Sequence, residues 1–185
     1  MMHNSLDEMD RTLRDVIDWA KQKQTGHGKE VQSCNTGDIV IEEANFLSGA
    51  AEWKEIKLLE RVDADEFIDI DREALHLIMQ NLISNAIKYS QPGQKVEVYS
   101  ESYGIDSVVI GVADQAGGMS PETANRIFSP GNHPNMAGTY EEKGTGIGLL
   151  LAQDLAEQMG SEIQLETDAI GSRFFLIFPV STPKE

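Results

Sequence analysis

The sequence predicts a two-layer α/β sandwich, in which a mixed and mostly antiparallel sheet lies under helices. Three observations lead to this fold class. Two pairs of short alternating segments, near residues 95–113 and 161–180, have the pattern of antiparallel neighbours. A strongly apolar helix over residues 73–89 has the buried spacing of a core element. Helices and strands alternate along a chain of 185 residues, which is enough for one ordinary domain and a small appendage.

The first half of the chain begins with an amphipathic helix over residues 5–24, which Ser5 can cap and Gly26 ends. Its apolar residues follow a three-four spacing, so this helix either lies on its own domain or packs against a second helix. The elements expected next are a polar connector over 29–37, a strand over 38–42, a helix over 43–53, and strands over 56–62 and 67–70.

The second half contains the apolar helix and the two strand pairs. Its connecting segments carry turn and loop signals: Gly104 joins one pair, and Pro121 begins a short helix. Residues 129–143 are rich in Gly, Pro and Asn without periodicity, which predicts a long loop, and such loops are usually functional. The expected elements are helices over 73–89, 121–127 and 146–159, and strands over 95–101, 107–113, 161–167 and 172–180.

Composition excludes several classes of protein. The net charge of −16, from 31 acidic and 15 basic residues, repels phosphates and argues against a nucleic-acid partner. The single cysteine, Cys34, cannot form an internal disulfide and fits a reducing compartment. No run of about 18 apolar residues is present, so direct membrane insertion is not expected. We expect a cytoplasmic chain, whose parent protein can itself be membrane-anchored.

Three polar stretches are candidates for one ligand site. Asn81 and Asn85 are four residues apart on an apolar helix, so their amides either ligate Mg²⁺ and phosphate oxygens or bond to nearby backbone. Asp114 ends a strand and precedes two glycines. This pattern suits either an ordinary turn or a carboxylate that accepts a hydrogen bond from the exocyclic amine of a purine. Gly144, Gly146 and Gly148 lead into a helix, whose free N–H groups favour anions.

The order and spacing of four stretches resemble those of the GHKL ATPases, the superfamily of gyrase, heat-shock chaperone ATPases, histidine kinases and mismatch-repair ATPases. Residues 81–90 are similar to the N box and 114–119 to the G1 box. Residues 126–132 are similar to the F box and 144–149 to the G2 box. The resemblance covers roughly residues 38–179, and it implies a GHKL-type ATP-binding domain over 38–182 with ATP and Mg²⁺ as cofactors.

The resemblance implies a role for each matching residue. Asn85 would be a magnesium ligand, and Asn81 would also meet the metal or the phosphates. Lys88 would contact phosphate, and Tyr89 would pack near the ribose or the base. Asp114 would read the adenine amine, with Gly118 making room for the base. Residues 129–143 would form the ATP lid, hinged at Phe128. The other implied nucleotide contacts are Met119, Gly144, Thr145, Gly146, Ile147, Gly148 and Leu149.

Asn81 distinguishes activities within the superfamily. The hydrolases carry a Glu at this position as the general base for water, and an amide cannot accept a proton at neutral pH. Asn81 and Lys88 are therefore expected to serve phosphoryl transfer. Residues 13–26 also resemble the end of the second dimerisation helix of histidine kinases, so residues 1–28 are expected to be a partial dimerisation helix, with a homodimer through residues 5–24.

The resemblance implies a histidine kinase catalytic domain, and two departures bear on it. Ala116 stands where the G1 box usually has its first Gly, and none of the four histidines lies in a phosphoacceptor motif. The implied partners are a phosphoacceptor histidine on a separate helix and a response-regulator receiver domain. Two alternatives remain: an anti-sigma-factor serine kinase of the same superfamily, and a degenerate scaffold that dimerises without nucleotide.

Overall fold

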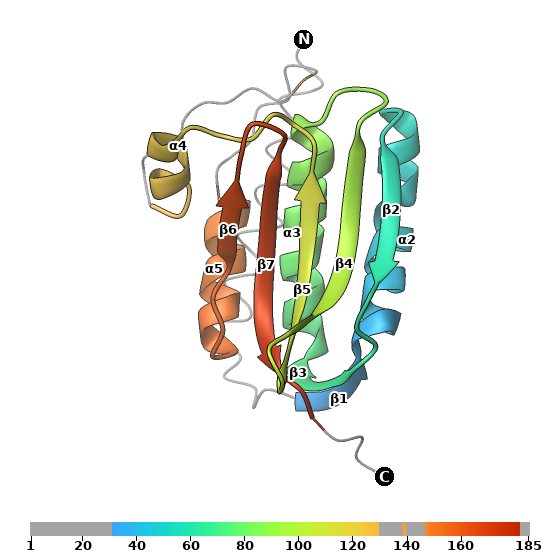
Figure 1. Ribbon diagram of the computed structural model, residues 1–185, viewed down its shortest axis with the longest axis vertical. Coiled ribbons are helices and arrows are strands. Elements are labelled where there is room, and N and C mark those ends of the chain that lie inside the picture. The colour runs from blue at the N-terminus through green and yellow to red at the C-terminus, as the bar shows by residue number, and fades with distance from the viewer. Residues whose placement is uncertain (1–30, 130–138, 140–146, 182–185) are drawn as a thin grey trace.

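The computed structural model describes residues 31–129, 139 and 147–181 (Figure 1). The predicted helix over residues 5–24, most of the predicted lid, and Gly144, Thr145 and Gly146 lie outside the described residues. Within the described part, one five-stranded sheet and one two-stranded sheet carry the fold.

The larger sheet has the strand order β2-β4-β5-β7-β6. β2 pairs with β4 in parallel, and every other neighbouring pair in this sheet is antiparallel. β1 and β3 form the separate antiparallel pair. The strands are β1 (Val31–Asn35), β2 (Lys57–Val62), β3 (Phe67–Asp71), β4 (Lys95–Tyr103), β5 (Ser107–Asp114), β6 (Gln164–Thr167) and β7 (Ser172–Pro179).

Among the described residues, the long helices lie on one face of the larger sheet and no helix lies on the other face (Figure 1). This arrangement confirms the predicted two-layer α/β sandwich. A short fourth helix, α4, extends from the end of the molecule at which β5 ends. The helices are α2 (Thr36–Trp53), α3 (Arg72–Tyr89), α4 (Pro121–Arg126) and α5 (Gly148–Gln158).

The central helix α3 is fixed by its cap and by its apolar face. The Asp71 side chain accepts a hydrogen bond from the Ala74 N–H, which satisfies one of the free donors at the helix start. Ile78, Met79 and Ile83 are completely buried in the main core between the helices and the sheet. Each such side chain stabilises the fold by about 1.5–3 kcal/mol relative to an exposed one. The predicted helix over residues 73–89 is confirmed.

Two predictions near the start of the domain were wrong. Residues 38–42, predicted as a strand, belong to α2, and the connector predicted over residues 29–37 contains β1. The Asn35 side chain caps α2 by accepting from the Asp38 N–H. The run of β-branched residues at 39–41 favours a strand locally, but burial of Ile39 and Val40 against the core overrides this preference. β1 is mostly polar, and Cys34 is the one residue of this strand that is buried.

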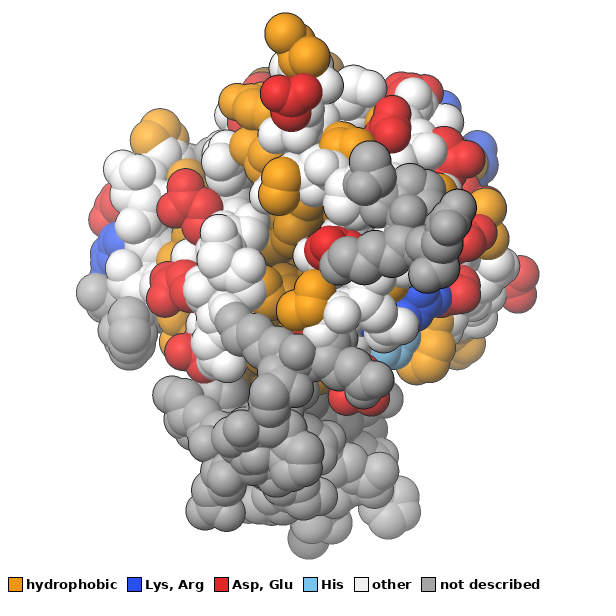
Figure 2. Space-filling model, turned by 90° about the horizontal axis from the view of Figure 1, so that it is seen from below, with side chains coloured by type: hydrophobic (Ala, Val, Ile, Leu, Met, Phe, Trp, Pro, Cys, Tyr) orange, Lys and Arg blue, Asp and Glu red, His pale blue; other side chains and the backbone are white. Residues whose placement is uncertain are grey.

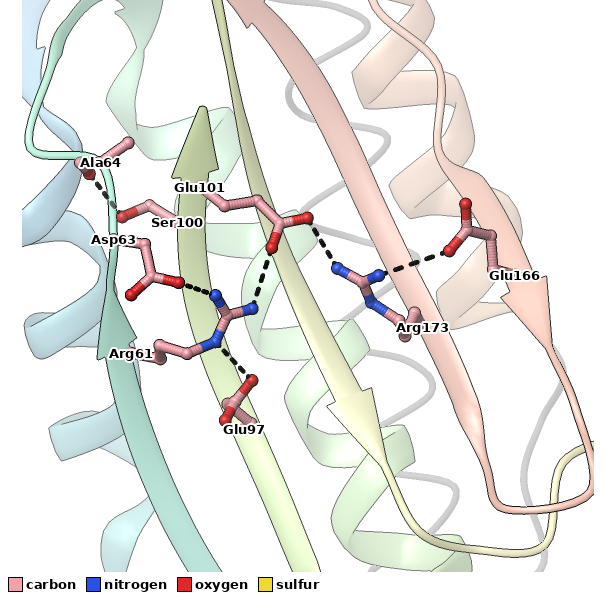
Figure 3. A network of polar contacts seen from close by, with 8 residues as sticks. All are labelled: Arg61, Asp63, Ala64, Glu97, Ser100, Glu101, Glu166 and Arg173. Carbon is pink, nitrogen blue, oxygen red and sulfur yellow. Dashed lines mark hydrogen bonds and ion pairs between the residues drawn. The ribbon is translucent and has the colours of Figure 1, made fainter. Parts of the chain in front are cut away.

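The face of the larger sheet opposite the helices carries a polar network (Figure 3). The Tyr99 ring crosses Gly111 of the neighbouring strand, where a Cβ atom would lie 2.8 Å from Cζ of the ring. The guanidinium groups of Arg61 and Arg173 each lie 4.9 Å from the ring centroid. The Glu101 carboxylate accepts from Arg61 at 3.0 Å and from Arg173 at 2.7 Å, so one carboxylate joins β2, β4 and β7. These contacts link three strands on the face that no described helix covers.

The end of the molecule that holds β1 and β3 is acidic, with hydrophobic side chains gathered near its middle (Figure 2). A cavity of about 450 Å³ lies at this end, between β1, β3 and the start of α2. Its walls include Cys34, Ile41 and Phe67, and none of the predicted site residues lines it. This cavity is therefore separate from the predicted nucleotide site.

Candidate nucleotide site

The predicted metal ligands lie on α3 and are half-buried. Asn81 Nδ2 donates a hydrogen bond to the Leu77 carbonyl at 2.8 Å, so this amide makes the backbone bond that was one of the two alternatives. The Asn85 side chain makes no hydrogen bond to another described residue. Buried amides are normally hydrogen-bonded, so the Asn85 amide is a candidate to bind a ligand.

The start of α5 lies directly against Asn81. A Cβ atom at Gly148 would lie 2.3 Å from Oδ1 of Asn81, so the close approach of the two helices requires a glycine. Within the first turn of α5 there is neither a side-chain cap nor an acidic residue, and Ile147 and Gly148 are half-buried while Leu149 is buried. The first N–H groups of an α-helix have no partner within the helix, so this turn suits an anionic ligand.

Asp114 ends β5 and holds the turn that follows it. Its Oδ1 accepts from the Ala116 N–H at 2.9 Å and from the Ser172 N–H at 3.2 Å. Burial raises the pKa of the Asp114 carboxyl above its ordinary value, and these two backbone hydrogen bonds oppose that rise. Ala116 does not have a positive φ, so a methyl group fits the backbone where the related boxes carry glycine.

The two glycines after Ala116 have different surroundings. Gly117 has a φ of 87° and Gly118 a φ of 65°, both in the left-handed region that favours glycine. A Cβ atom would meet nothing within 4 Å at Gly117, whereas at Gly118 it would lie 1.8 Å from the Asp168 carbonyl oxygen. The missing side chain of Gly118 thus makes room for the turn between β6 and β7.

Sequence reasoning missed this supporting turn. The Thr167 hydroxyl accepts from the Met119 N–H at 3.0 Å, and a Cβ atom at Gly171 would lie 1.8 Å from the Asp114 carbonyl oxygen. Asp168 Oδ1 accepts from the Ile170 and Gly171 N–H groups, which closes the turn. The available signal was the Asp-x-x-Gly spacing, which is typical of an Asx turn.

The C-terminal end of α3 contacts two other segments that were predicted to bind nucleotide. The Lys88 carbonyl accepts from the Thr139 N–H and hydroxyl, each at 3.3 Å. Gln94, just after α3, donates to the Gln115 carbonyl at 2.6 Å, next to Asp114. The last turn of α3 and the end of β5 lie at the same end of the domain (Figure 1). The predicted lid therefore contacts the end of α3, and the G1-like stretch contacts the turn that follows α3.

The remaining predicted contacts belong to this region or to the core beneath it. Lys88 Nζ lies 5.4 Å from the centroid of the Tyr89 ring. Met119 and Phe128 are partly buried and pack on the main core. The Phe128 ring meets Phe174 of β7 edge to face, with centroids 6.5 Å apart. Phe128 is therefore anchored to the sheet at the point where the predicted lid begins.

The described residues hold no group of three or more His, Cys, Asp or Glu side chains that could bind a metal ion. Among the helices of the described residues, none is long and apolar enough to cross a membrane.

Comparison with known proteins identifies the family. Residues 70–182 match the family model of the histidine kinase-, DNA gyrase B- and HSP90-like ATPases. The sensor histidine kinase ZraS of Salmonella typhimurium is 28% identical over 184 residues, which is 97% of this chain and 37% of that protein. The chain thus spans well under half the length of this relative.

Two solved structures share the fold. Full-length ShkA, solved in complex with AMPPNP, superposes with a TM-score of 0.79 at 22% identity, over 98% of this chain and 38% of that one. The histidine kinase ThkA, solved in complex with the response regulator protein TrrA, superposes with a TM-score of 0.75 at 20% identity, over 95% and 49%. With its sheet, its helices and the family match over residues 70–182 in agreement, the chain belongs to the histidine kinase-, DNA gyrase B- and HSP90-like ATPase family.

Proposed function

We propose that this chain is the ATP-binding catalytic domain of a two-component sensor histidine kinase. It would present the γ-phosphoryl group of Mg-ATP to a histidine on a dimerisation helix. The observation that carries this proposal is the identity of residue 81. Asn81 occupies the place of the hydrolases' general base, and its amide already donates to the Leu77 carbonyl. Such a group cannot take a proton from water, which favours transfer over hydrolysis.

The residues present fit a magnesium nucleotide. Asn85 offers an accessible amide oxygen, which is a hard ligand suited to Mg²⁺. Bound Mg²⁺ would neutralise phosphate charge, as phosphoryl transfer generally requires. Lys88 would add a second positive charge from the next turn of the same helix. The N–H groups at the start of α5, beside Asn81, would face the phosphates. The protein's contribution is then positioning and electrostatic stabilisation.

The adenine end of the nucleotide would meet Asp114. A carboxylate reads an exocyclic amine only when it is ionised and held in place, and two backbone N–H groups stabilise the ionised form here. Because Ala116 has an unstrained backbone, it gives no support to a degenerate domain unable to bind nucleotide. The rigid turn instead supports a pre-formed adenine site.

The partners in this proposal follow from the relatives. ThkA was solved with a response regulator protein, and a receiver domain is the expected final acceptor of the phosphoryl group here as well. Residues 1–28 would supply part of a dimerisation helix, and a homodimer would form through residues 5–24. The acceptor histidine would come from a helix that is not in this chain.

The test is calorimetry of the chain with ATP, with and without Mg²⁺, on the wild type and on Asp114→Asn. We expect binding that Mg²⁺ strengthens and an affinity loss of about 10–100-fold in the variant, since a hydrogen bond to a charged group is worth about 1.5–3 kcal/mol. Glu122→Gln, an exposed acid on α4, is the control and should bind like the wild type.

A second arm tests the type of reaction. Incubation with labelled ATP should leave no acid-labile phosphate on this chain alone. Release of inorganic phosphate at a steady rate would indicate a hydrolase and contradict the proposal. Labelling of a serine in a small antagonist protein would point to a serine kinase instead, and failure to bind any nucleotide would point to a scaffold.

A further inference from the structure

Lys54 is a buried lysine that none of the preceding roles uses. It follows α2 directly, and only 2% of its surface is exposed. Lysine is almost never fully buried unless its amino group has a partner. The Lys54 amino group donates a hydrogen bond to the Lys88 carbonyl, 34 residues along the chain in the last turn of α3.

Among the described residues, this contact is one of three hydrogen bonds between the turn that follows α2 and the end of α3 together with the turn that follows it. The Gly93 N–H donates to the Glu55 carbonyl at 2.8 Å, and the Lys57 N–H donates to the Gln94 carbonyl at 2.9 Å. The two turns therefore form one unit. Of the three contacts, only the one made by Lys54 uses a side chain, so it is the one that a substitution can remove.

The Lys54 amino group lies at the C-terminal end of α3, next to the residues proposed to contact the nucleotide. Helix C-terminal carbonyls carry partial negative charge, and a lysine near them is favourable. The Lys88 carbonyl also accepts from Thr139, so two segments meet at one backbone oxygen. The same turn of α3 carries the side chains of Lys88 and Tyr89. Any shift of this turn would move both side chains.

We propose that Lys54 is a positioning residue for the nucleotide: by holding the Lys88 carbonyl, it fixes the last turn of α3 so that the Lys88 side chain faces the phosphates. This inference rests on the proposed function, because it assumes that Lys88 contacts ATP. Lys54 itself touches no phosphate. Its effect on ATP affinity must therefore pass through Lys88.

A double-mutant cycle tests this dependence. Lys54→Met keeps the length of the side chain and removes the donor. We expect ATP affinity to fall about tenfold in Lys54→Met and about tenfold in Lys88→Met, with no further fall in the double variant. Lys57→Met, which removes an exposed amino group three residues away, should change affinity less than twofold. Affinities come from calorimetry with Mg-ATP, and thermal unfolding confirms that each variant is folded.

Additive losses in the cycle would show that Lys54 acts on the fold and not through Lys88, and would overturn the inference, as would unchanged affinity in Lys54→Met. If the wild type binds no ATP, the proposed function fails first and the positioning role fails with it. Should either variant fold or bind too poorly for the cycle, NMR of the unmutated chain decides. The Lys54 amino protons should be protected from exchange and should shift on addition of Mg-ATP. Unprotected or unshifted protons would refute the role.

Discussion

The support of the Asp114 turn by the β6–β7 turn predicts the outcome of three glycine substitutions. Gly117→Ala changes only backbone freedom, because φ is 87° and the space is empty. Gly171→Ala changes only packing, because its Cβ would lie 1.8 Å from the Asp114 carbonyl oxygen while φ is not positive. Gly118→Ala combines both, with a φ of 65° and a Cβ 1.8 Å from the Asp168 carbonyl oxygen.

The magnitudes follow from these geometries. An L-residue in the left-handed region costs about 1–2 kcal/mol, and the lower chain entropy of alanine in the unfolded state returns about 0.4–1 kcal/mol. Gly117→Ala should therefore lower the free energy of unfolding by about 1 kcal/mol. Forcing a methyl group against fixed backbone costs about 1–3 kcal/mol, so after the same entropy gain Gly171→Ala should lose about 0–2.6 kcal/mol. Gly118→Ala should lose about 2–4 kcal/mol, because the two costs add.

Urea unfolding followed by circular dichroism measures these free energies, and calorimetry with Mg-ATP gives a second reading. Gly171→Ala and Gly118→Ala displace the turn that holds Asp114, so both should also weaken nucleotide binding more than Gly117→Ala does. The reasoning would be refuted if Gly118→Ala were no less stable than Gly117→Ala, since the contact with Asp168 would then have no energetic effect.

Substitutions at three further positions test other parts of the fold. Burial raises the pKa of the Glu43 carboxyl above its ordinary value of 4.5, so the folded state binds this proton more tightly than the unfolded chain does. As pH rises above about 4.5, the free energy of unfolding of the wild type should therefore fall relative to that of Glu43→Gln. Urea titrations measure this difference, and a rise would contradict the prediction. Glu55 has a φ of 57°, so Glu55→Gly should stabilise the protein by about 0.5–1 kcal/mol and raise the melting temperature, whereas Glu55→Ala should not. The Tyr99 hydroxyl is buried, and no described residue is oriented to form a hydrogen bond with it, although Arg173 lies near. Burial raises the pKa of the Tyr99 hydroxyl to about 12. Tyr99→Phe should therefore leave the free energy of unfolding unchanged or raise it by up to about 1 kcal/mol, and a clear loss would reveal a missed hydrogen bond.

Local patterns predicted the elements that pack by a regular period. The apolar spacing of α3 identified it within one residue at its start, and the alternation in β4, β5 and β7 located those strands. The pattern failed where tertiary contacts outweighed local preference. Residues 39–41 are β-branched yet helical, because Asn35 caps α2 and the core buries one side of that helix.

The motifs of the candidate site could be proposed from the sequence, and the residues that support them could not. Residue type and spacing pointed to Asn85 and Asp114 as candidates, because each lies within a short recognisable stretch. The neighbours that shape the site come from far along the chain: Asp168 is 50 residues from Gly118, and Lys54 is 34 residues from the carbonyl it holds. No local period encodes such pairs, so only the folded arrangement reveals them.

The order of strands in the larger sheet also determines how the domain meets copies of itself. Its two outer strands are β2 and β6. β6 has only four residues, and β2 carries the charges of Lys57, Glu60 and Arg61. Short or charged edge strands are poor templates for the addition of another strand. Pairing of edge strands between copies of the domain, which can lead to fibrils, is therefore disfavoured.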